Sequence, residues 1–204
     1  MDNNGYTNTD VKFEWYDEAT VTVTKNGTIM DYRSGKKFTD DGEYTITIEN
    51  FDGYKAVYCF TIDTAAPELK IEGASNKEAV RTDVAVFFTE QNLITELFKN
   101  GESIGVYNAG DVLSSDGQYK LVVSDLAGNT SNVEFTIDKT VDFAINVNDN
   151  GLSNSVIANA NENVTVKLTK NGEEIEYILV SAITEPADYV LEVTDKLGNY
   201  EKIS

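Results

Sequence analysis

Apolar and polar residues alternate along most of this chain, and the alternation is clearest at residues 116–138. Two extended runs in that stretch are joined by a short connection that contains Gly128. The apolar positions of the two runs are Tyr119, Leu121, Val123, Val133, Phe135 and Ile137. A period of two places these side chains on one face of each run, which predicts a β-hairpin with one face on a core and the other in water.

The same strand–hairpin–strand pattern occurs three times. The first copy spans residues 41–63, and the third begins at Ala187 and runs to Ser204. Self-similarity at a period of about 70 to 75 residues predicts three similar small domains in a row. Units of this size are near the lower limit for a self-sufficient core, so we expect each to be compact and only moderately stable.

The repeat divides the chain into residues 1–65, 66–139 and 140–204, which are called repeat one, repeat two and repeat three. We expect the opening strand of repeat one to be missing or irregular and repeat two to be the most complete. In repeat three the last strand should be cut short near Ser204. The chain is therefore interpreted as a segment of something longer.

Each repeat carries two turn signals. The tripeptide Lys-Asn-Gly precedes the repeat tyrosine at a nearly constant distance, and Asn-Gly between alternating runs predicts a tight hairpin because both turn residues must take positive φ. A second glycine lies in the hairpin that follows the tyrosine. The predicted turn residues are Asn26, Gly27, Asn100, Gly101, Asn171, Gly172, Gly53, Gly128 and Gly198.

Many short strands with frequent turn signals and no sustained helical periodicity predict an all-β chain of three tandem immunoglobulin-like (Ig-like) β-sandwich domains, arranged as an elongated rod. In such sandwiches a tyrosine near the start of a late strand donates its hydroxyl to the backbone a few residues upstream, which is called a tyrosine corner. Tyr44, Tyr119 and Tyr189 occur in register after polar turns and are predicted to form these corners.

The combination of Lys-Asn-Gly, Asp-Gly-x-Tyr, an Asp-x-x-Gly-Asn hairpin and Phe-Thr-Ile-Asp resembles the tandem bacterial Ig-like repeats of Gram-positive cell-surface proteins. The hairpin at residues 125–129 fits best and that at 195–199 fits well, whereas residues 50–54 depart from the pattern. The Pro-containing linker at residues 63–67 also fits, and residues 138–141 lack the proline. The resemblance covers nearly the whole chain and implies an extracellular, cell wall-associated location. It does not identify one function, because such repeats serve as spacers, adhesive tips and enzyme appendages.

The net charge of −19 is spread over all three repeats. No basic stripe is present that could neutralise phosphates, which argues against a nucleic-acid partner. An anionic membrane surface would also repel this chain, so we expect no membrane contact by this segment.

The sequence contains no histidine and a single cysteine, Cys59, so no internal disulfide can form. Without histidine the chain lacks the commonest general base and the commonest metal ligand. The serines have no histidine to activate them, and no pair of carboxylates has an environment typical of catalysis. We therefore predict no enzymatic activity, no cofactor and no catalytic residue.

Residues 146–151 resemble the first half of a calcium-binding EF-hand loop. The twelfth position would be Ile157, where such a loop requires a bidentate glutamate. A polar turn is therefore the favoured interpretation, and no metal site is predicted.

Aromatic side chains offer the best candidates for ligand contact, since their flat apolar faces can stack on sugars. Trp15 lies in phase with Val11 and Phe13 and is predicted to be part of a core. Tyr16, Tyr32 and Tyr54 are the predicted ligand-contacting aromatics.

Two functions remain open from the sequence. The first is a non-catalytic stalk or adhesin segment, in which Ig-like modules act as spacer and interaction scaffold beside neighbouring domains of a longer chain. The alternative is a carbohydrate- or host-protein-binding module attached to a secreted enzyme or adhesin. In both cases the partner would be an extracellular protein or a glycan.

Overall fold

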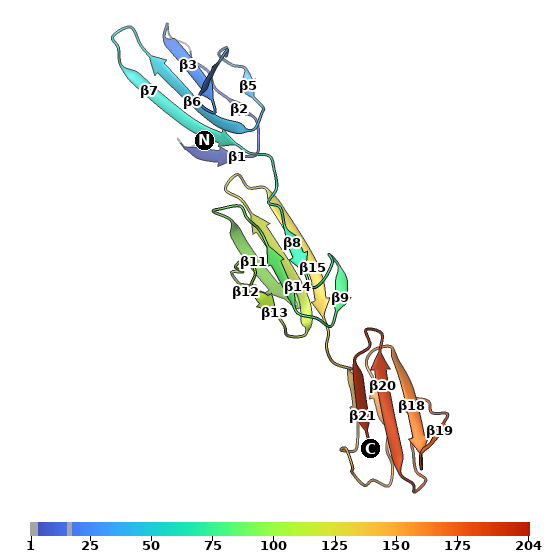
Figure 1. The fold of residues 1–204 in the computed structure, drawn as a ribbon. Coiled ribbons are helices and arrows are strands. Elements are labelled where there is room, and N and C mark those ends of the chain that lie inside the picture. Colours follow the sequence, from blue (N-terminus) through green and yellow to red (C-terminus); the bar gives the residue numbers. More distant parts are fainter. Residues whose placement is uncertain (1–3, 16–17) are drawn as a thin grey trace. The chain divides into compact units, whose positions relative to one another are not determined.

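The computed structural model describes residues 4–15 and 18–204, and the regular elements in these ranges are all β-strands (Figure 1). Repeat one contains β1 (Gly5–Thr7), β2 (Val11–Lys12), β3 (Thr20–Lys25), β4 (Thr28–Met30), β5 (Lys37–Phe38), β6 (Gly42–Glu49) and β7 (Lys55–Ile62). Repeat two contains β8 (Lys70–Glu72), β9 (Glu78–Val80), β10 (Val84–Phe87), β11 (Ile94–Lys99), β12 (Glu102–Gly105), β13 (Val112–Leu113), β14 (Gly117–Ser124) and β15 (Thr130–Ile137). Repeat three contains β16 (Phe143–Ile145), β17 (Ala158–Ala160), β18 (Val164–Lys170), β19 (Glu173–Ile175), β20 (Tyr189–Asp195) and β21 (Tyr200–Ile203).

Each hydrogen-bonded sheet is made from strands of one repeat. Repeat one has a five-stranded sheet in the order β1-β7-β6-β3-β4 and a β2-β5 pair. Repeat two has a five-stranded sheet in the order β12-β11-β14-β15-β9 and a three-stranded sheet, β13-β10-β8. Repeat three has a four-stranded sheet in the order β19-β18-β20-β21 and a β16-β17 pair. A larger and a smaller sheet in each repeat are the two layers of an Ig-like sandwich.

The core of repeat one lies between its two sheets. The buried side chains come from β3, β6 and β7 of the larger sheet and from β5 of the smaller one. They are Val23, Phe38, Tyr44, Ile46, Phe60 and Ile62. The Phe38 ring meets the rings of Tyr44 and Phe60 edge-on at 4.8 and 5.3 Å. Trp15, predicted to be a core residue, is half-buried beside Phe13 and Tyr32.

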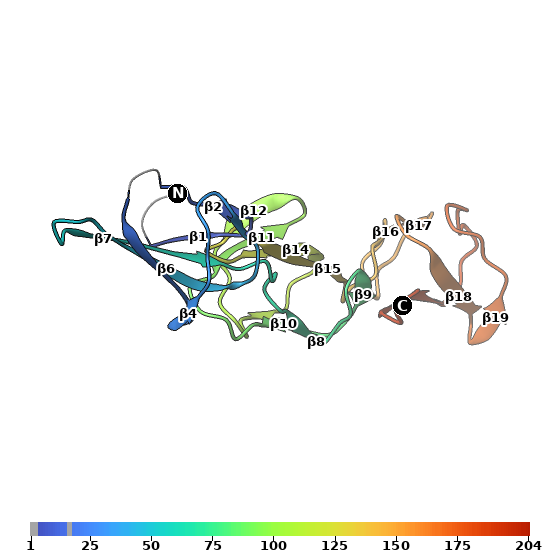
Figure 2. The ribbon, with the colours of Figure 1, turned by 90° about the horizontal axis from the view of Figure 1, so that it is seen from above.

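Repeat three is built in the same way with smaller side chains. Its buried hydrophobic residues are Ala158 from β17, Leu168 from β18, and Leu191 and Val193 from β20. Figure 2 shows the β16–β17 pair separated from β18 and β19, so the core lies between two layers.

The hairpin β14–β15 of repeat two shows the predicted alternation. Tyr119, Leu121 and Val123 are buried along β14, and every second residue from Val133 to Ile137 is buried along β15. The prediction of an all-β, Ig-like chain is therefore confirmed.

Contacts between Cα atoms group the chain into two compact units. One comprises Met1–Ile71, Val86–Asp111 and Lys120–Val133, and the other comprises Glu72–Ala85, Val112–Tyr119 and Glu134–Ser204. The boundary passes through repeat two, whereas the sheets keep the strands of that repeat together.

Candidate functional site

The tyrosine of each organising hairpin is bonded to the turn before it. Its hydroxyl donates to the carbonyl oxygen four residues upstream, at 2.7 Å for Tyr44, 2.8 Å for Tyr119 and 3.1 Å for Tyr189. The first two side chains are buried, and Tyr189 is half-buried. These are the geometry and the direction of a tyrosine corner.

A second tyrosine also recurs in register, in addition to the predicted corner tyrosine. Tyr32, Tyr107 and Tyr177 each precede the corner tyrosine by the same interval, and each hydroxyl donates to the carbonyl oxygen four residues downstream. Burial raises the pKa of Tyr32 and of Tyr107. The constant spacing was the signal that could have revealed these residues.

The predicted turn residues have the backbone conformations that their turns require. In the three Lys-Asn-Gly turns the φ angles are 50° to 52° for asparagine and 76° to 87° for glycine. The N–H of each second glycine donates to the carbonyl oxygen three residues before it, and its φ lies between 82° and 90°. Positive φ at consecutive residues is what Asn-Gly accommodates best in a two-residue hairpin.

A hydrogen-bonded Asp–Asn pair in repeat two, with Asp125 buried and Asn129 half-buried, binds the linker that precedes it. Asp125 Oδ1 accepts a hydrogen bond from the Asn129 backbone N–H, and Asp125 Oδ2 accepts one from Asn129 Nδ2, both at 2.8 Å. Asn129 Nδ2 also donates to the carbonyl oxygen of Asp63, again at 2.8 Å. We call Asp63, Asp125 and Asn129 the first junction.

Repeat three contains the same arrangement. Asn199 Nδ2 donates to Asp195 Oδ2 at 2.7 Å and to the carbonyl oxygen of Asp138 at 2.9 Å. Asp138, Asp195 and Asn199 form the second junction, where Arg81 also donates to the Gly198 carbonyl oxygen at 2.7 Å. Asp195 and Asn199 are buried, as is Asp125 at the first junction. Buried polar groups are normally hydrogen-bonded, and here each of these side chains is.

The linkers are also bonded on their other side. The Thr64 N–H donates to Asp41 Oδ1, and the Lys139 N–H donates to Asp116 Oδ1, both at 3.1 Å. Asp41 and Asp116 are the aspartates of the Asp-Gly-x-Tyr motif. Each linker is therefore hydrogen-bonded to equivalent positions of the repeat before it and of the repeat after it.

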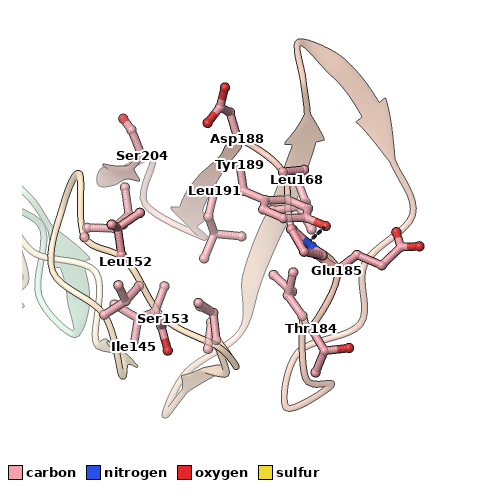
Figure 3. Close-up of a pocket in the computed structure, with 18 of the residues that line it drawn as sticks. Ile145, Leu152, Ser153, Leu168, Thr184, Glu185, Asp188, Tyr189, Leu191 and Ser204 are labelled. Atoms are coloured by element: carbon pink, nitrogen blue, oxygen red, sulfur yellow. Dashed lines mark hydrogen bonds between the residues drawn. The ribbon is translucent and has the colours of Figure 1, made fainter.

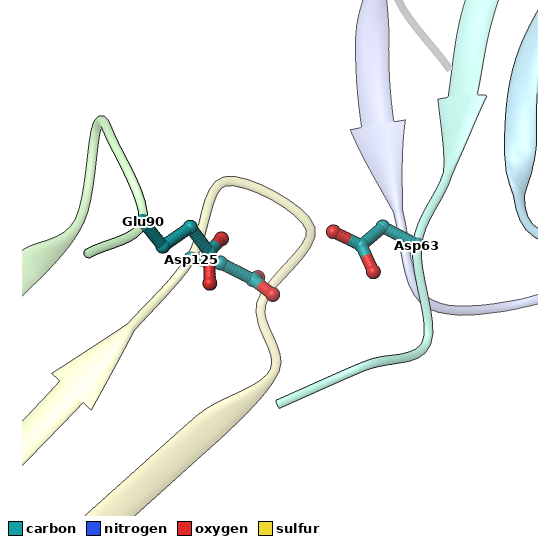
Figure 4. A group of neighbouring side chains, drawn as sticks. All are labelled: Asp63, Glu90 and Asp125. Atoms are coloured by element: carbon teal, nitrogen blue, oxygen red, sulfur yellow. The ribbon is translucent and has the colours of Figure 1, made fainter. Parts of the chain in front are cut away.

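Each junction brings three carboxylates together. Asp63, Glu90 and Asp125 each offer an oxygen within 4.8 Å of the others, and Figure 4 shows that they come from three separate segments. Asp138, Glu162 and Asp195 form the matching group in the second junction. Such oxygen donors suit a hard cation such as Ca²⁺, which takes six to eight oxygen ligands.

One carboxyl in each group has a raised pKa. Burial is the main cause for Glu90, followed by the charges of Asp125 and Asp63. Burial is also the main cause for Asp138, with the charge of Asp195 adding to it. Clusters of like charge favour protonation of one member. The absence of a metal site, expected from the sequence, stays a prediction. Cation binding at either of these two carboxylate groups would contradict it.

The predicted ligand-contacting aromatics are in different environments. Tyr16 lies outside the described residues. The Tyr32 ring stacks on Phe38 with centroids 4.0 Å apart, so it contributes to the core of repeat one. Tyr54 is 76% exposed in the β6–β7 hairpin beside Phe51, which is fully exposed. Only Tyr54 of these three therefore presents an open ring in the described part of the chain.

Residues 146–151 form a turn that is closed by Asn146. Its Oδ1 accepts from the Ile157 N–H at 2.8 Å, and its Nδ2 donates to the Ser155 carbonyl oxygen at 3.0 Å. Both ends of the amide are thus used in holding the loop, as in a polar turn.

No helix in the described part of the chain has the length and apolarity needed to cross a membrane.

No protein-family model matches this sequence, and no curated protein matches it either. Solved structures to which the chain is similar include an I-band fragment of titin, which is 13% identical with a TM-score of 0.44 and covers 98% of this chain and 92% of its own. The N-terminal eight Ig domains of Down Syndrome Cell Adhesion Molecule are 13% identical with a TM-score of 0.37 and cover 98% and 34%. SGBP-B of the Bacteroides ovatus mixed-linkage glucan utilization locus, in complex with a mixed-linkage heptasaccharide, is 17% identical with a TM-score of 0.24 and covers 98% and 61%.

Proposed function

We propose that this chain is a non-catalytic segment of an extracellular cell-surface stalk, in which Ig-like repeats act as spacers and as a scaffold for interaction. The observation that carries this proposal is the double attachment of both linkers, to Asp41 or Asp116 on one side and to Asn129 or Asn199 on the other. A spacer must limit free bending at its linkers, and side chain-to-backbone hydrogen bonds do so at modest energetic gain.

The composition supports the same function. The acidic surface favours solubility over association with nucleic acid or membrane. Histidine is absent from the sequence, which leaves acyl-transfer chemistry of the Ser-His type without its base. The resemblance of the hairpin and linker motifs to Gram-positive surface repeats supports a bacterial cell wall as the location.

The spacer function can be tested by breaking the attachment. In the double variant Asn129→Ala and Asn199→Ala, each linker loses its hydrogen bond to the following hairpin. We expect the three repeats of the unaltered chain to tumble together in ¹⁵N relaxation measurements and those of the double variant to tumble more independently. Tyr54→Ala is the matched control, because it alters the equivalent hairpin position of repeat one. Equal relaxation in the double variant and the unaltered chain would contradict the proposal.

One observation favours the alternative, a module that binds a glycan or a host protein. Phe51 and Tyr54 expose two aromatic rings at one hairpin, at positions where repeat two has Leu126 and Asn129. Binding on a glycan array or to cells that is lost in Phe51→Ser and Tyr54→Ser, but kept in Leu126→Ser, would support this alternative. The stalk proposal predicts that substitutions at this hairpin leave any binding unchanged.

A further inference from the structure

The larger sheet of repeat one has an outer face whose central positions are all uncharged. Val23 of β3, Ile46 of β6 and Phe60 of β7 are buried in the core. Because side chains alternate between the two faces of a strand, the residues on either side of these three point outward. The outward residues at the centre of β3, β6 and β7, which we call the threonine face, are Thr22, Thr24, Thr45, Thr47, Val57 and Cys59.

The threonine face is a regular array with apolar side chains at its sides. Ile29 of β4 pairs with Thr24, and Tyr6 of β1 pairs with Thr61 of β7, which places both on the outer face. Both side chains are exposed. The six residues form two rows that cross the strands in register, Thr22–Thr47–Val57 and Thr24–Thr45–Cys59.

Repeat three carries charges on the same face of its larger sheet. Leu168 of β18 and Leu191 of β20 point to the interior of the sandwich (Figure 3), so Lys167 and Glu192 lie on the outer face. They are equivalent to the first two residues of the row that begins with Thr22 in repeat one. All three positions of that row are charged in repeat three, where they are Lys167, Glu192 and Lys202.

Repeat two also has charges at these positions. Counted from the Lys-Asn-Gly turn and the corner tyrosine, the equivalents of the threonine face include Glu96, Lys120 and Glu134. A sheet face in water normally carries polar and charged side chains. Depletion of charge is instead typical of the centre of a protein–protein interface, so repeat one differs from its sister repeats in the direction of a contact surface.

The charge of the chain indicates which partner suits this face. A second copy carries the same net charge of −19, and like charges that face each other oppose association. Two copies can meet at the threonine face without opposing carboxylates. A hydroxyl group is both donor and acceptor, whereas a carboxylate only accepts, so a face of threonines can hydrogen-bond to an identical face.

The area of the sheet is sufficient for such a contact. Five strands about 4.8 Å apart, with a ladder of eight pairs at about 3.4 Å per residue, span roughly 600 Å² on each copy. Two copies would then bury about 1,200 Å² together, which is the lower end of the range for specific interfaces.

We propose that repeat one is a self-association module, in which the threonine face packs against the threonine face of a second copy of this chain. A two-fold axis relates the copies, so each contact occurs twice. The two sheets stack face to face about 10 Å apart, with threonine hydroxyls bonded across the centre and Ile29 and Tyr6 at the sides. The proposal does not depend on the stalk function, because it concerns a contact between copies in solution.

The first test is sedimentation velocity of the full chain from about 10 µM to about 1 mM, which brackets the affinity of a small interface. We expect a dimer whose fraction rises with concentration. Thr47→Glu introduces the charge that repeat three has at Glu192 and should raise the dissociation constant at least about tenfold, because the two copies then oppose like charges. Val122→Glu alters the equivalent position of repeat two by the same charge and should have no effect. A chain that stays monomeric at about 1 mM, or equal effects of both substitutions, would overturn the proposal.

A second substitution separates the threonine face from net charge. Thr22→Lys makes the chain less acidic, so a general reduction of repulsion would strengthen association. The proposal predicts weaker association, because a lysine at this position must lose water in the contact. Repeat three folds with Lys167 at the equivalent position, and an unchanged melting temperature of repeat one would show that the variant is folded. Stronger association of Thr22→Lys would overturn the proposal.

Cys59 allows the contact to be located, because it is the single cysteine of the chain and lies on the threonine face. A bismaleimide with a reach comparable to the separation of about 10 Å between packed sheets should join Cys59 of two copies. The control chain carries Cys59→Ser and Glu134→Cys, which moves the thiol to the equivalent position of repeat two. We expect the covalent dimer to form severalfold faster in the unaltered chain, and equal rates would overturn the proposal.

Discussion

Repeat two and repeat three share a tyrosine corner, a Lys-Asn-Gly turn and a hydrogen-bonded Asp–Asn pair, yet they differ in the side chains that fill their cores. β15 buries Phe135 and Ile137 in the core of repeat two, whereas the buried core of repeat three consists of Ala158, Leu168, Leu191 and Val193. Tyr119 is 3% exposed beneath the Phe135 ring, and Tyr189 is half-buried.

The comparison separates local from long-range contributions within one chain. The turns and the corner hydrogen bond form in repeat three, where the fully buried core side chains are aliphatic. The corner tyrosine is more deeply buried in repeat two, where the Phe135 ring stacks on it. The following predictions test this separation, beginning with the largest expected effect.

Removal of the Phe135 ring should make repeat two resemble repeat three. Phe135→Ala deletes a buried aromatic side chain that stacks on Tyr119, and such truncations lower the free energy of unfolding by about 3 to 5 kcal/mol. Chemical denaturation followed by residue-resolved NMR measures the loss in repeat two. Phe60→Ala in repeat one serves as the parallel variant, and a loss below about 1 kcal/mol would show that the strand end contributes little.

Hydrogen exchange should rank the repeats without any substitution. The core of repeat two includes the buried side chains of Phe135 and Ile137, which each contribute roughly 1.5 to 3 kcal/mol when fully buried, whereas the buried core of repeat three has smaller side chains. We therefore expect repeat three to open first, through Tyr200–Ser204, and repeat two last. Slower exchange at residues 190–193 than at residues 121–123 would contradict this order.

The tyrosine corner should contribute more in repeat two than in repeat three. Tyr119→Phe removes one partly buried hydrogen bond and should lower the stability of repeat two by about 1 kcal/mol. Tyr189→Phe should have a smaller effect, because the hydroxyl of Tyr189 bonds in a more exposed setting. Denaturation midpoints of the two variants give the comparison, and an unchanged midpoint for Tyr119→Phe would count against the corner.

Both junctions should make stability depend weakly on pH. Burial raises the pKa of Glu90 and of Asp138, so in the folded chain these carboxyls hold their protons to a higher pH than in the unfolded chain. The stabilisation of the folded chain by these protonated carboxyls is fully present below the ordinary carboxyl pKa. It is lost as the pH rises through the raised pKa of the folded chain. Stability measured upward from acidic pH should fall less steeply in Glu90→Gln than in the exposed control Glu102→Gln. If stability depended on pH equally in both variants, Glu90 would be excluded as the cause of that dependence.

The smallest expected effect is that of cations. The sequence predicts no metal requirement, and we expect the melting temperature to change little when a chelator is added. A ligand of the folded state must raise the melting temperature. A clear rise with millimolar calcium that is absent in Asp125→Asn would contradict this prediction and would assign the carboxylates of the first junction to a cation.

Much of the fold follows from local physical chemistry and was predictable. The alternation at residues 116–138 specifies which face of each strand is buried, because side chains of a strand point to opposite sides in turn. Asn-Gly selects tight hairpins, because asparagine and glycine tolerate positive φ. The register of Tyr44, Tyr119 and Tyr189 indicated a corner from spacing alone.

Other features required the tertiary structure. Tyr32 was predicted to contact ligand, but the structure stacks it on Phe38 and bonds its hydroxyl to the backbone. The carboxylates of the first junction come from a linker, a loop and a hairpin, and no spacing rule places Glu90 beside them.

By itself the sequence determined the strand pattern, the turns, the threefold repeat and the exclusion of histidine-dependent chemistry, because each depends on neighbouring residues or on composition. Only the tertiary structure decided which carboxylates meet and how Asn129 and Asn199 hold the linkers. These features depend on contacts between segments that are distant in the chain, and such contacts are set by packing of the whole repeat rather than by local preference.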